Sequence, residues 1–261
     1  MRSADPALLA RWGVTIETSL AETELGSLFK VVCKDGTRAV LKLAVPHMEG
    51  LHEAEGLRFW NGDPTVRLLE YEAEQHAMLL ELCIPGTTLR ELPEPEQDVI
   101  IASLLRRLWD RTDGAWHNPC FRHLSEMITH WSTETLEQGR PDSELTREGL
   151  LLFEELSRPF PLGDVLLATD LHAGNVLRAE RRRWLVTDPK PFIGDRSYDA
   201  TQHLFNCRDR LRADPDETIN RFAELLDVSP RRVRLWMFAR AAAEPRDDWR
   251  EWVDLARSLI P

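Results

Sequence analysis

The stretch from residue 165 to residue 199 constrains the fold and chemistry of this chain more than any other part of its 261 residues. Three short apolar runs lie in it, at residues 165–168, 176–178 and 184–187. Short apolar runs bounded by turn residues are typical of β-strands. Asp170, Asn175 and Asp188 follow or precede these runs, so the pattern predicts three polar side chains presented where strands end.

Two carboxylates and a carboxamide in this order suit phosphoryl transfer from ATP. The transition state of that reaction is loose and highly charged, so catalysis depends on positioning and on electrostatic stabilisation. Mg²⁺ supplies countercharge and prefers oxygen ligands, which Asn175 and Asp188 offer. Asp170 would then be free to accept or orient the proton of an attacking hydroxyl. Taken singly, Asp170 could be a turn residue and Asn175 the cap of a bend; the three together favour a catalytic site.

The motifs DLHAGN (from Asp170), VTDPK (ending at Lys190) and GDRSYD (ending at Asp199) resemble the aminoglycoside phosphotransferase superfamily. The DPK form resembles its streptomycin 6-kinase and hydroxyurea phosphotransferase branch. The resemblance implies an α+β, two-lobed protein-kinase-like fold, with a small antiparallel-sheet N-terminal lobe and a larger, mainly helical C-terminal lobe. It also implies ATP and Mg²⁺ as cofactors, Asp170 as catalytic base, and Asn175 and Asp188 as magnesium ligands.

The chain departs from the family pattern at two places. Ala168 and Thr169 stand where His-Gly often precedes the catalytic Asp, and Asp188 is followed by Pro189 and Lys190 instead of an aromatic residue and an acid or glycine. Without that aromatic residue, we expect no activation-loop regulation. Lys190, two residues from Asp188, is predicted to lie near the transferred phosphate; the alternative is a solvated surface lysine.

Nucleotide binding is expected in the N-terminal part. Residues 28–33 and 38–43 are β-rich and are joined by Asp35-Gly36, a hairpin turn signal. Lys42 lies on the second strand and matches the kinase lysine that pairs with the α- and β-phosphates. A helix is predicted to begin near His47, and it carries Glu53, the first choice to orient Lys42, and Glu55, the second.

Further nucleotide contacts are predicted at two other places. Gly26 and Ser27 could cradle phosphates with their backbone amides, although the segment has no full glycine-rich loop. Residues 76–82 form a buried strand, after which backbone groups at Glu81 and Cys83 are expected to face adenine. These expectations divide the chain into a nucleotide-binding lobe at residues 1–84 and a helical lobe with the catalytic loop and acceptor site at residues 85–261.

The remainder of the chain shows helical periodicity. The predicted helices cover residues 97–109, 121–137, 145–157, 216–226, 230–243 and 247–259. A further helix opens at Asp195 and Asp199, and the family resemblance implies that this segment supports the catalytic loop. We expect the two acids to be structural residues; the alternative is that they are substrate ligands.

Composition excludes several classes of function. The net charge of −11 disfavours binding to a phosphate backbone and suits a cationic small acceptor, although acidity also serves solubility alone. No apolar run reaches the roughly 20 residues that span a bilayer, and the N-terminus has no signal-peptide pattern. Four scattered cysteines without a CxxC pair indicate reduced thiols. We therefore expect a cytoplasmic protein with no membrane or nucleic-acid partner; its oligomeric state stays open.

Two competing signals were weighed. Residues 223–236 resemble a helix-turn-helix whose second helix carries Arg231, Arg232 and Arg234, but the acidic chain offers no second basic patch. His117, Cys120 and His123 have spacing that could suit zinc, but no fourth ligand lies nearby.

The sequence as a whole predicts an ATP- and Mg²⁺-dependent O-phosphotransferase for a small, cationic antibiotic such as a streptomycin-like aminoglycoside. The alternatives are a kinase of another small hydroxylated metabolite and a kinase-like binding protein without turnover.

Overall fold

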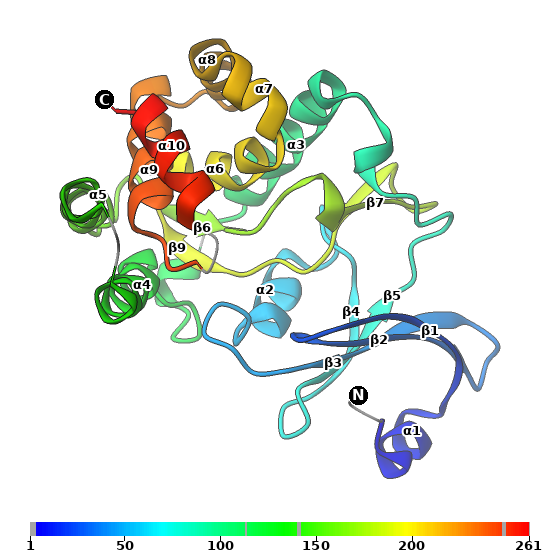
Figure 1. The fold of residues 1–261 in the computed structure, drawn as a ribbon. Coiled ribbons are helices and arrows are strands. Elements are labelled where there is room, and N and C mark those ends of the chain that lie inside the picture. Colours follow the sequence, from blue (N-terminus) through cyan, green and yellow to red (C-terminus); the bar gives the residue numbers. More distant parts are fainter. Residues whose placement is uncertain (1–3, 113, 140–141, 247–248, 261) are drawn as a thin grey trace. The chain divides into compact units, whose positions relative to one another are not determined.

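The structure, a computed structural model, describes residues 4–112, 114–139, 142–246 and 249–260 (Figure 1). The chain forms two compact units. One contains the chain up to Leu89 together with Asn175–Lys190, and the other contains Arg90–Gly174 and the chain from Pro191 onward. The sequence analysis placed a single division between residues 84 and 85, whereas the first unit also takes in a segment from far along the chain.

The first unit is built on a five-stranded antiparallel sheet in the order β1-β2-β3-β5-β4. Its strands are β1 (Val14–Thr23), β2 (Gly26–Cys33), β3 (Arg38–Ala44), β4 (Leu68–Glu72) and β5 (Ala77–Glu81). The structure confirms the hairpin predicted at Asp35-Gly36: the Asp35 carboxylate accepts a hydrogen bond from the Thr37 amide at 2.9 Å, and Gly36 has a φ of 83°.

Side chains alternate along β3 and separate the two faces of the sheet. Ala39, Leu41 and Leu43 are buried in one apolar cluster, together with Leu8 of helix α1 (Pro6–Trp12). The intervening Val40 packs instead against a second cluster, which contains residues of helix α2 (Glu53–Trp60). Lys42, two residues after Val40, therefore belongs to the face covered by α2.

A short hairpin of β7 (Val176–Arg178) and β8 (Trp184–Val186) completes the first unit. Its residues Ala179 and Leu185 are buried in the same cluster as α2. The Val186 amide also donates to the carbonyl of Pro64 at 3.0 Å. Burial and backbone hydrogen bonds thus place this distant segment with the N-terminal sheet, which a contiguous division of the sequence could not represent.

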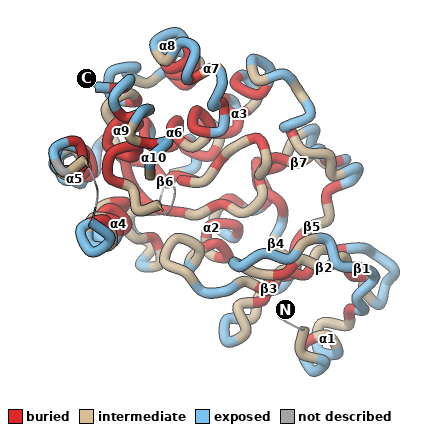
Figure 2. The backbone as a smooth tube through the Cα atoms, in the orientation of Figure 1, coloured by how far each residue is buried: buried red, intermediate tan, exposed pale blue. Residues whose placement is uncertain are grey.

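Helices dominate the second unit. They are α3 (Glu94–Trp109), α4 (Leu124–Gln138), α5 (Ser143–Leu156), α6 (Arg196–Asn206), α7 (Arg208–Ala213), α8 (Pro215–Leu226), α9 (Pro230–Ala243) and α10 (Trp249–Ser258). A short 3₁₀ turn lies at Ala115–His117, and two others, Leu89–Glu91 and Ala173–Asn175, lie where the chain passes from one unit to the other. Helix α9 contacts α4, α5, α6, α8 and α10 and is buried along most of its length (Figure 2). A two-stranded sheet of β6 (Val165–Leu167) and β9 (Phe192–Gly194) lies in the same unit.

The expected α+β architecture is confirmed, and the C-terminal helices agree with the prediction. Each of the six predicted C-terminal helices overlaps an observed one. The prediction that a helix begins near His47 is wrong: the Gly50 amide donates to the His47 carbonyl in a turn, and α2 begins only at Glu53. No helix among the described residues is both long enough and apolar enough to cross a membrane.

Candidate active site

A largely buried lysine of the first unit, Lys42, is held by two carboxylates. The Lys42 amine donates to Glu53 Oε2 at 2.6 Å and to Asp188 Oδ1 at 2.7 Å. Strand alternation points Lys42 towards α2, and Glu53 is the first residue of that helix. Of the two acids considered from the sequence, Glu53 is therefore the one that contacts Lys42, whereas Glu55 lies 3.8 Å from Arg58.

Burial and charge act against each other in this trio. Burial opposes the charge on Lys42, but the carboxylates of Glu53 and Asp188 outweigh it and raise the pKa of the lysine. For Glu53 burial outweighs the attraction of Lys42 and raises its pKa to about 7. Burial opposes ionisation of Asp188 too, but the positive charges of Lys42 and Lys190 hold the pKa of its carboxyl below the usual range. A charged lysine and an ionised Asp188 follow from this arrangement.

The hairpin of β7 and β8 brings the two predicted metal ligands together at its open end. The Thr187 amide donates to the backbone carbonyl of Asn175 at 2.8 Å, so Asn175 lies opposite the residue that precedes Asp188. Asp188 itself adopts the left-handed conformation, with a φ of 52°. An ionised carboxylate and a carboxamide at one hairpin end are the oxygen donors that Mg²⁺ prefers, so these residues fit the ion. The positive charge of Lys190 acts on both Asp188 and Glu53.

Asp188 carries a direct prediction about the metal. Replacing it by Asn removes the carboxylate charge, and we expect MgADP to bind roughly 10- to 100-fold more weakly, while ADP without metal binds nearly as before. Isothermal titration with and without Mg²⁺ measures both constants. An unchanged MgADP affinity in the Asp188→Asn protein would remove Asp188 from the metal site.

The predicted hinge residues are only partly available to a nucleotide. The Glu81 amide donates to the carbonyl of Arg67 at 2.9 Å, and the Glu81 carboxylate is bound by Arg181. Adenine contacts at this strand would therefore use the carbonyl of Glu81 or the backbone of Cys83. The thiol of Cys83 is buried, and burial raises its pKa to about 11, so this residue offers backbone groups and no reactive thiolate.

Gly26 and Ser27 lie inside the sheet, not in an open loop. Both residues pair with β1 on one side and β3 on the other, and only two residues separate β1 from β2. A Cβ added at Gly26, whose φ is 151°, would lie 2.4 Å from the carbonyl oxygen of Leu43. The glycine is therefore explained by the sheet, and a phosphate contact from this pair stays a prediction.

The loop that carries Asp170 belongs to the second unit, where Asp199 supports it. The Asp199 carboxylate accepts hydrogen bonds from the amides of Ala168 (3.1 Å) and Thr169 (2.8 Å) and from the indole nitrogen of Trp109 (2.9 Å). Thr169 has a φ of 48°, a left-handed conformation that is unusual for a β-branched residue. Asp199 thus fixes the strained backbone immediately before Asp170, in agreement with the structural role expected for it.

Burial raises the pKa of Asp199 to about 6, against the hydrogen bonds that lower it. An acid whose pKa is raised on folding keeps its proton in the native state after the unfolded chain has lost it, so stability falls as pH rises from about 4 to about 6. We therefore expect the wild-type advantage over Asp199→Asn in free energy of unfolding to be larger at pH 4 than at pH 7. Urea unfolding of both proteins at several pH values measures this difference. A constant difference would mean that Asp199 is ionised throughout.

His172 and Gly174 in the same loop pack against the side chain of Arg90. The Arg90 guanidinium contacts His172 Nδ1 at 3.3 Å and donates to the Asn206 side chain at 3.2 Å, and the Gly174 amide also donates to His172 Nδ1, at 2.9 Å. Because both neighbours are donors, Nδ1 is the acceptor nitrogen of the ring. A Cβ added at Gly174 would lie 2.7 Å from His172 Cε1 and 2.9 Å from Arg90 Cζ. Close packing therefore explains this glycine.

This packing was not predicted from the sequence. It leaves little room for a methyl group at Gly174. We expect Gly174→Ala to lower turnover by up to about 100-fold, because a displacement of about 1 Å near the reacting groups is sufficient for such a loss. In an Arg90→Ala background the added methyl has more room, so the loss should be smaller. Steady-state rates of the two single variants and the double variant measure the coupling. Full activity of Gly174→Ala would contradict the steric argument.

Several other polar groups considered from the sequence, Arg232, Arg234, Asp195 and His123, have partners within the protein. Arg232 binds Asp195, and Arg234 binds Asp216, so two of the three arginines of the possible helix-turn-helix are paired within the protein. Asp195 also accepts the Trp236 indole N–H at 2.6 Å, which makes it a structural residue. His123, one of the possible zinc ligands, lies 3.1 Å from Asp164.

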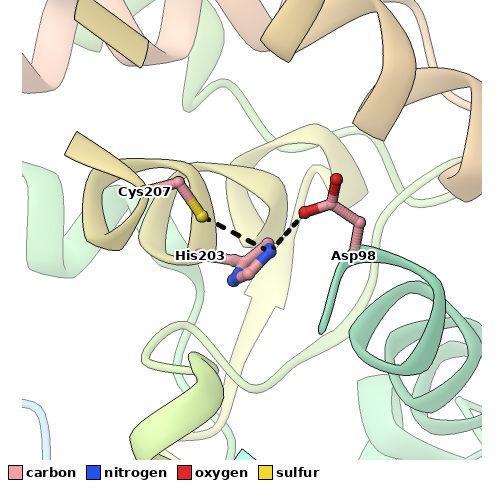
Figure 3. Close-up of side chains that lie close together, drawn as sticks. All are labelled: Asp98, His203 and Cys207. Atoms are coloured by element: carbon pink, nitrogen blue, oxygen red, sulfur yellow. Dashed lines mark hydrogen bonds and ion pairs between the residues drawn. The ribbon is translucent and has the colours of Figure 1, made fainter. Parts of the chain in front are cut away.

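One buried group has the proximity of metal ligands. Asp98, His203 and Cys207 lie within 4.8 Å of one another (Figure 3). However, the Asp98 carboxylate also binds Arg210 at 2.6 and 2.8 Å and Arg221 at 3.2 Å. Burial raises the pKa of Cys207 to about 12, which keeps the thiol protonated. Two guanidinium groups and a neutral thiol oppose a cation, so this cluster is an ionic link between helices.

Comparison with known proteins places the chain in a family. The family model described as aminoglycoside/hydroxyurea antibiotic resistance kinase matches residues 11–247. Streptomycin 6-kinase of Streptomyces griseus is 31% identical over 252 residues, which cover 90% of this chain and 80% of that protein. Hydroxyurea phosphotransferase of Kitasatospora aureofaciens is 34% identical over 209 residues, which cover 76% of this chain and 59% of that protein.

Solved structures show the same fold at low identity. Choline kinase LicA from Streptococcus pneumoniae aligns with a TM-score of 0.67 at 14% identity, covering 97% of this chain and 94% of that one. Aminoglycoside phosphotransferase APH(4)-Ia, in complex with ADP and hygromycin B, aligns with a TM-score of 0.59 at 17% identity, covering 97% and 94%. The solved structures show the fold, and the family model and the curated relatives show that the chain belongs to the aminoglycoside/hydroxyurea antibiotic resistance kinase family and is an ATP-dependent phosphotransferase that acts on a hydroxyl group.

Proposed function

We propose that this kinase transfers the terminal phosphoryl group of MgATP to a hydroxyl of a small, cationic antibiotic of the streptomycin-like aminoglycoside class, and thereby confers resistance. The observation that carries the proposal is the Lys42 trio. A lysine held at 2.6 and 2.7 Å by two carboxylates, one of them at a hairpin end shared with Asn175, is an arrangement suited to a metal-bound nucleotide.

Each residue has a distinct part in this reaction. Lys42, kept charged and oriented by Glu53, binds the α- and β-phosphates. Asn175 and Asp188 hold Mg²⁺, which neutralises phosphate charge when bound. Asp170, on a loop fixed by Asp199, orients the acceptor hydroxyl and takes its proton. Lys190 lies near the transferred phosphate; its positive charge already acts on the carboxyl groups of Asp188 and Glu53.

Two observations support a cationic acceptor. The chain has a net charge of −11, which attracts a cation and repels polyanions. The curated relatives include two streptomycin 6-kinases, the second being the protein from Streptomyces glaucescens at 32% identity over 242 residues, which cover 89% of this chain and 78% of that protein. A cytoplasmic location also follows from the proposal, because the phosphoryl donor is an intracellular nucleotide.

Magnesium-dependent ADP release tests the proposal directly. The assay uses streptomycin, other aminoglycosides, peptide antibiotics and hydroxyurea as acceptors, with the Asp170→Asn protein as control. Release with a streptomycin-like compound that the control lacks would establish the acceptor class. Release only with hydroxyurea or with an unrelated hydroxylated compound would replace the proposed acceptor. No ADP release with any acceptor, together with no MgATP binding, would favour a kinase-like protein without turnover.

A further inference from the structure

Arg181 lies in the turn between β7 and β8, at the opposite end of the hairpin from Asn175 and Asp188. Its guanidinium group donates hydrogen bonds to three residues outside the hairpin. Its Nε and Nη2 donate to the two oxygens of Glu81, both at 2.8 Å. Its Nη1 donates to the carbonyl of Gly62 at 2.7 Å, and Nη2 also donates to the carbonyl of Thr65 at 3.1 Å. We name these four residues the Arg181 anchor.

The anchor joins three pieces of the first unit that are distant in sequence. Glu81 ends β5, and Gly62 and Thr65 belong to the connection between α2 and β4. The Glu81 carboxylate is fixed in turn by the Arg67 amide at 3.0 Å. Burial opposes the charge of Glu81, but the hydrogen bonds from Arg181 and Arg67 lower the pKa of this carboxyl. Both side chains are about one-fifth exposed, at 23% and 18%, so solvent weakens this pair less than a surface pair.

The geometry favours arginine specifically. A bidentate guanidinium matches a carboxylate and restricts both side chains in one plane, which a lysine ammonium cannot do. The neighbouring turn residue provides a contrast. Arg182 forms an ion pair with Asp63 at 3.3 Å through a single nitrogen, and its side chain is 46% exposed. Of these two adjacent arginines, only Arg181 fixes the turn to the sheet.

We propose that Arg181 is a positioning residue for the metal site: it fixes the β7–β8 hairpin against β5, so that Asn175 and Asp188 are presented in one geometry. The proposal rests on the proposed function, since it requires that those two residues bind Mg²⁺ with the nucleotide. The hairpin has only three residues per strand, roughly 10 Å in length, so a tilt at its turn is transmitted to its open end. Groups that hydrogen-bond directly to metal ligands typically contribute about 10- to 100-fold to metal affinity, and we expect the lower end of this range for Arg181, which acts through the hairpin.

The test measures nucleotide binding, with no acceptor present. Titration calorimetry gives the dissociation constant of MgADP and that of ADP in the presence of a chelator, for the wild type and for Arg181→Ala, Arg181→Lys and Arg182→Ala. We expect Arg181→Ala to weaken MgADP binding by about 10-fold or more, with metal-free ADP changed by less than about threefold. The MgADP dissociation constant of Arg181→Lys should lie between those of the wild type and Arg181→Ala, and that of Arg182→Ala should match the wild type.

Two further measurements separate positioning from mere stability. Hydrogen exchange at the Val186 amide, which donates to Pro64, should accelerate in Arg181→Ala, because the hairpin is less firmly fixed. In a double-mutant cycle, adding Glu81→Gln to Arg181→Ala should cause little extra loss of MgADP affinity. If Arg181→Ala does not fold, Arg181→Lys serves for the same comparison.

Three outcomes would overturn the proposal: an unchanged MgADP constant in folded Arg181→Ala, an equal loss for metal-free ADP, or an equal loss in Arg182→Ala. Failure of the proposed function is distinguishable from these three outcomes. In that case the wild-type protein itself would bind no MgADP, which is measured before any variant is compared.

Discussion

The Asp170→Asn protein is expected to bind MgADP with nearly the wild-type dissociation constant and to transfer phosphate about 10²- to 10⁴-fold more slowly, the range typical of a lost general base. Asn occupies the same volume and can still accept a hydrogen bond through one oxygen, but it cannot take the proton of the hydroxyl. The loop should keep its conformation, because the substitution leaves in place the hydrogen bonds from the amides of Ala168 and Thr169 to Asp199.

Steady-state rates and calorimetric binding constants check this expectation together. Asp254→Asn is a matched control, since Asp254 is a surface acid whose side chain is 86% exposed. The control should keep full turnover. Wild-type turnover in Asp170→Asn would overturn the assignment of the base, and a large loss of MgADP affinity would mean that Asp170 belongs to the metal site instead.

Asp98→Ala should reduce the free energy of unfolding by about 3 to 5 kcal/mol, the usual cost of removing one partner from a buried ion pair. Asp98 and His203 are fully buried, and the substitution leaves the His203 ring without this carboxylate, whereas Arg210 keeps its ion pair with Glu94 at 3.3 Å. The value should lie near the lower end, because Arg210 and Arg221 are 20% and 43% exposed and can turn towards water. The substitution would remove the ionic contacts by which Asp98 on α3 links to α6, α7 and α8.

Urea unfolding at pH 7 measures this loss as a lower midpoint. Asp216→Ala is the control: Asp216 also binds an arginine, Arg234, but its side chain is 79% exposed, so the expected loss is below about 1 kcal/mol. Arg210 and His203 lower the pKa of Asp98 against the effect of burial. Its contribution is therefore complete above the unfolded pKa and is lost only as pH falls towards the lowered one. Similar midpoints for the two variants would mean that the Asp98 cluster adds no more than a surface pair.

The local elements around the site could be predicted from sequence because their signals are local. Asp35-Gly36 specifies a hairpin by its own turn preference, and Lys42 follows on a strand of alternating buried residues. The C-terminal helices show a repeat of apolar residues that requires only neighbours three and four positions apart. The loop carrying Asp170 was found through residue types that phosphoryl transfer requires.

Elements with weak local patterns were missed. Strand β1 is exposed along most of its length, so its residues alternate little between apolar and polar (Figure 2). The start of α2 was placed about six residues too early, because the turn from His47 to Gly50 gives no strong stop signal. That start also determines which acid meets Lys42, since residues two apart on a helix point in different directions.

What the sequence by itself determined is the set of candidate groups: a lysine on a strand, an aspartate that we propose as the base and two oxygen donors that we propose as metal ligands, each recognisable by type and spacing. Only the tertiary structure decided which groups meet. Arg181 and Glu81 are 100 residues apart, and Asp98 and His203 are 105 apart. Such pairs leave no periodic trace in a single sequence, because they form only when burial of the apolar faces brings distant segments together.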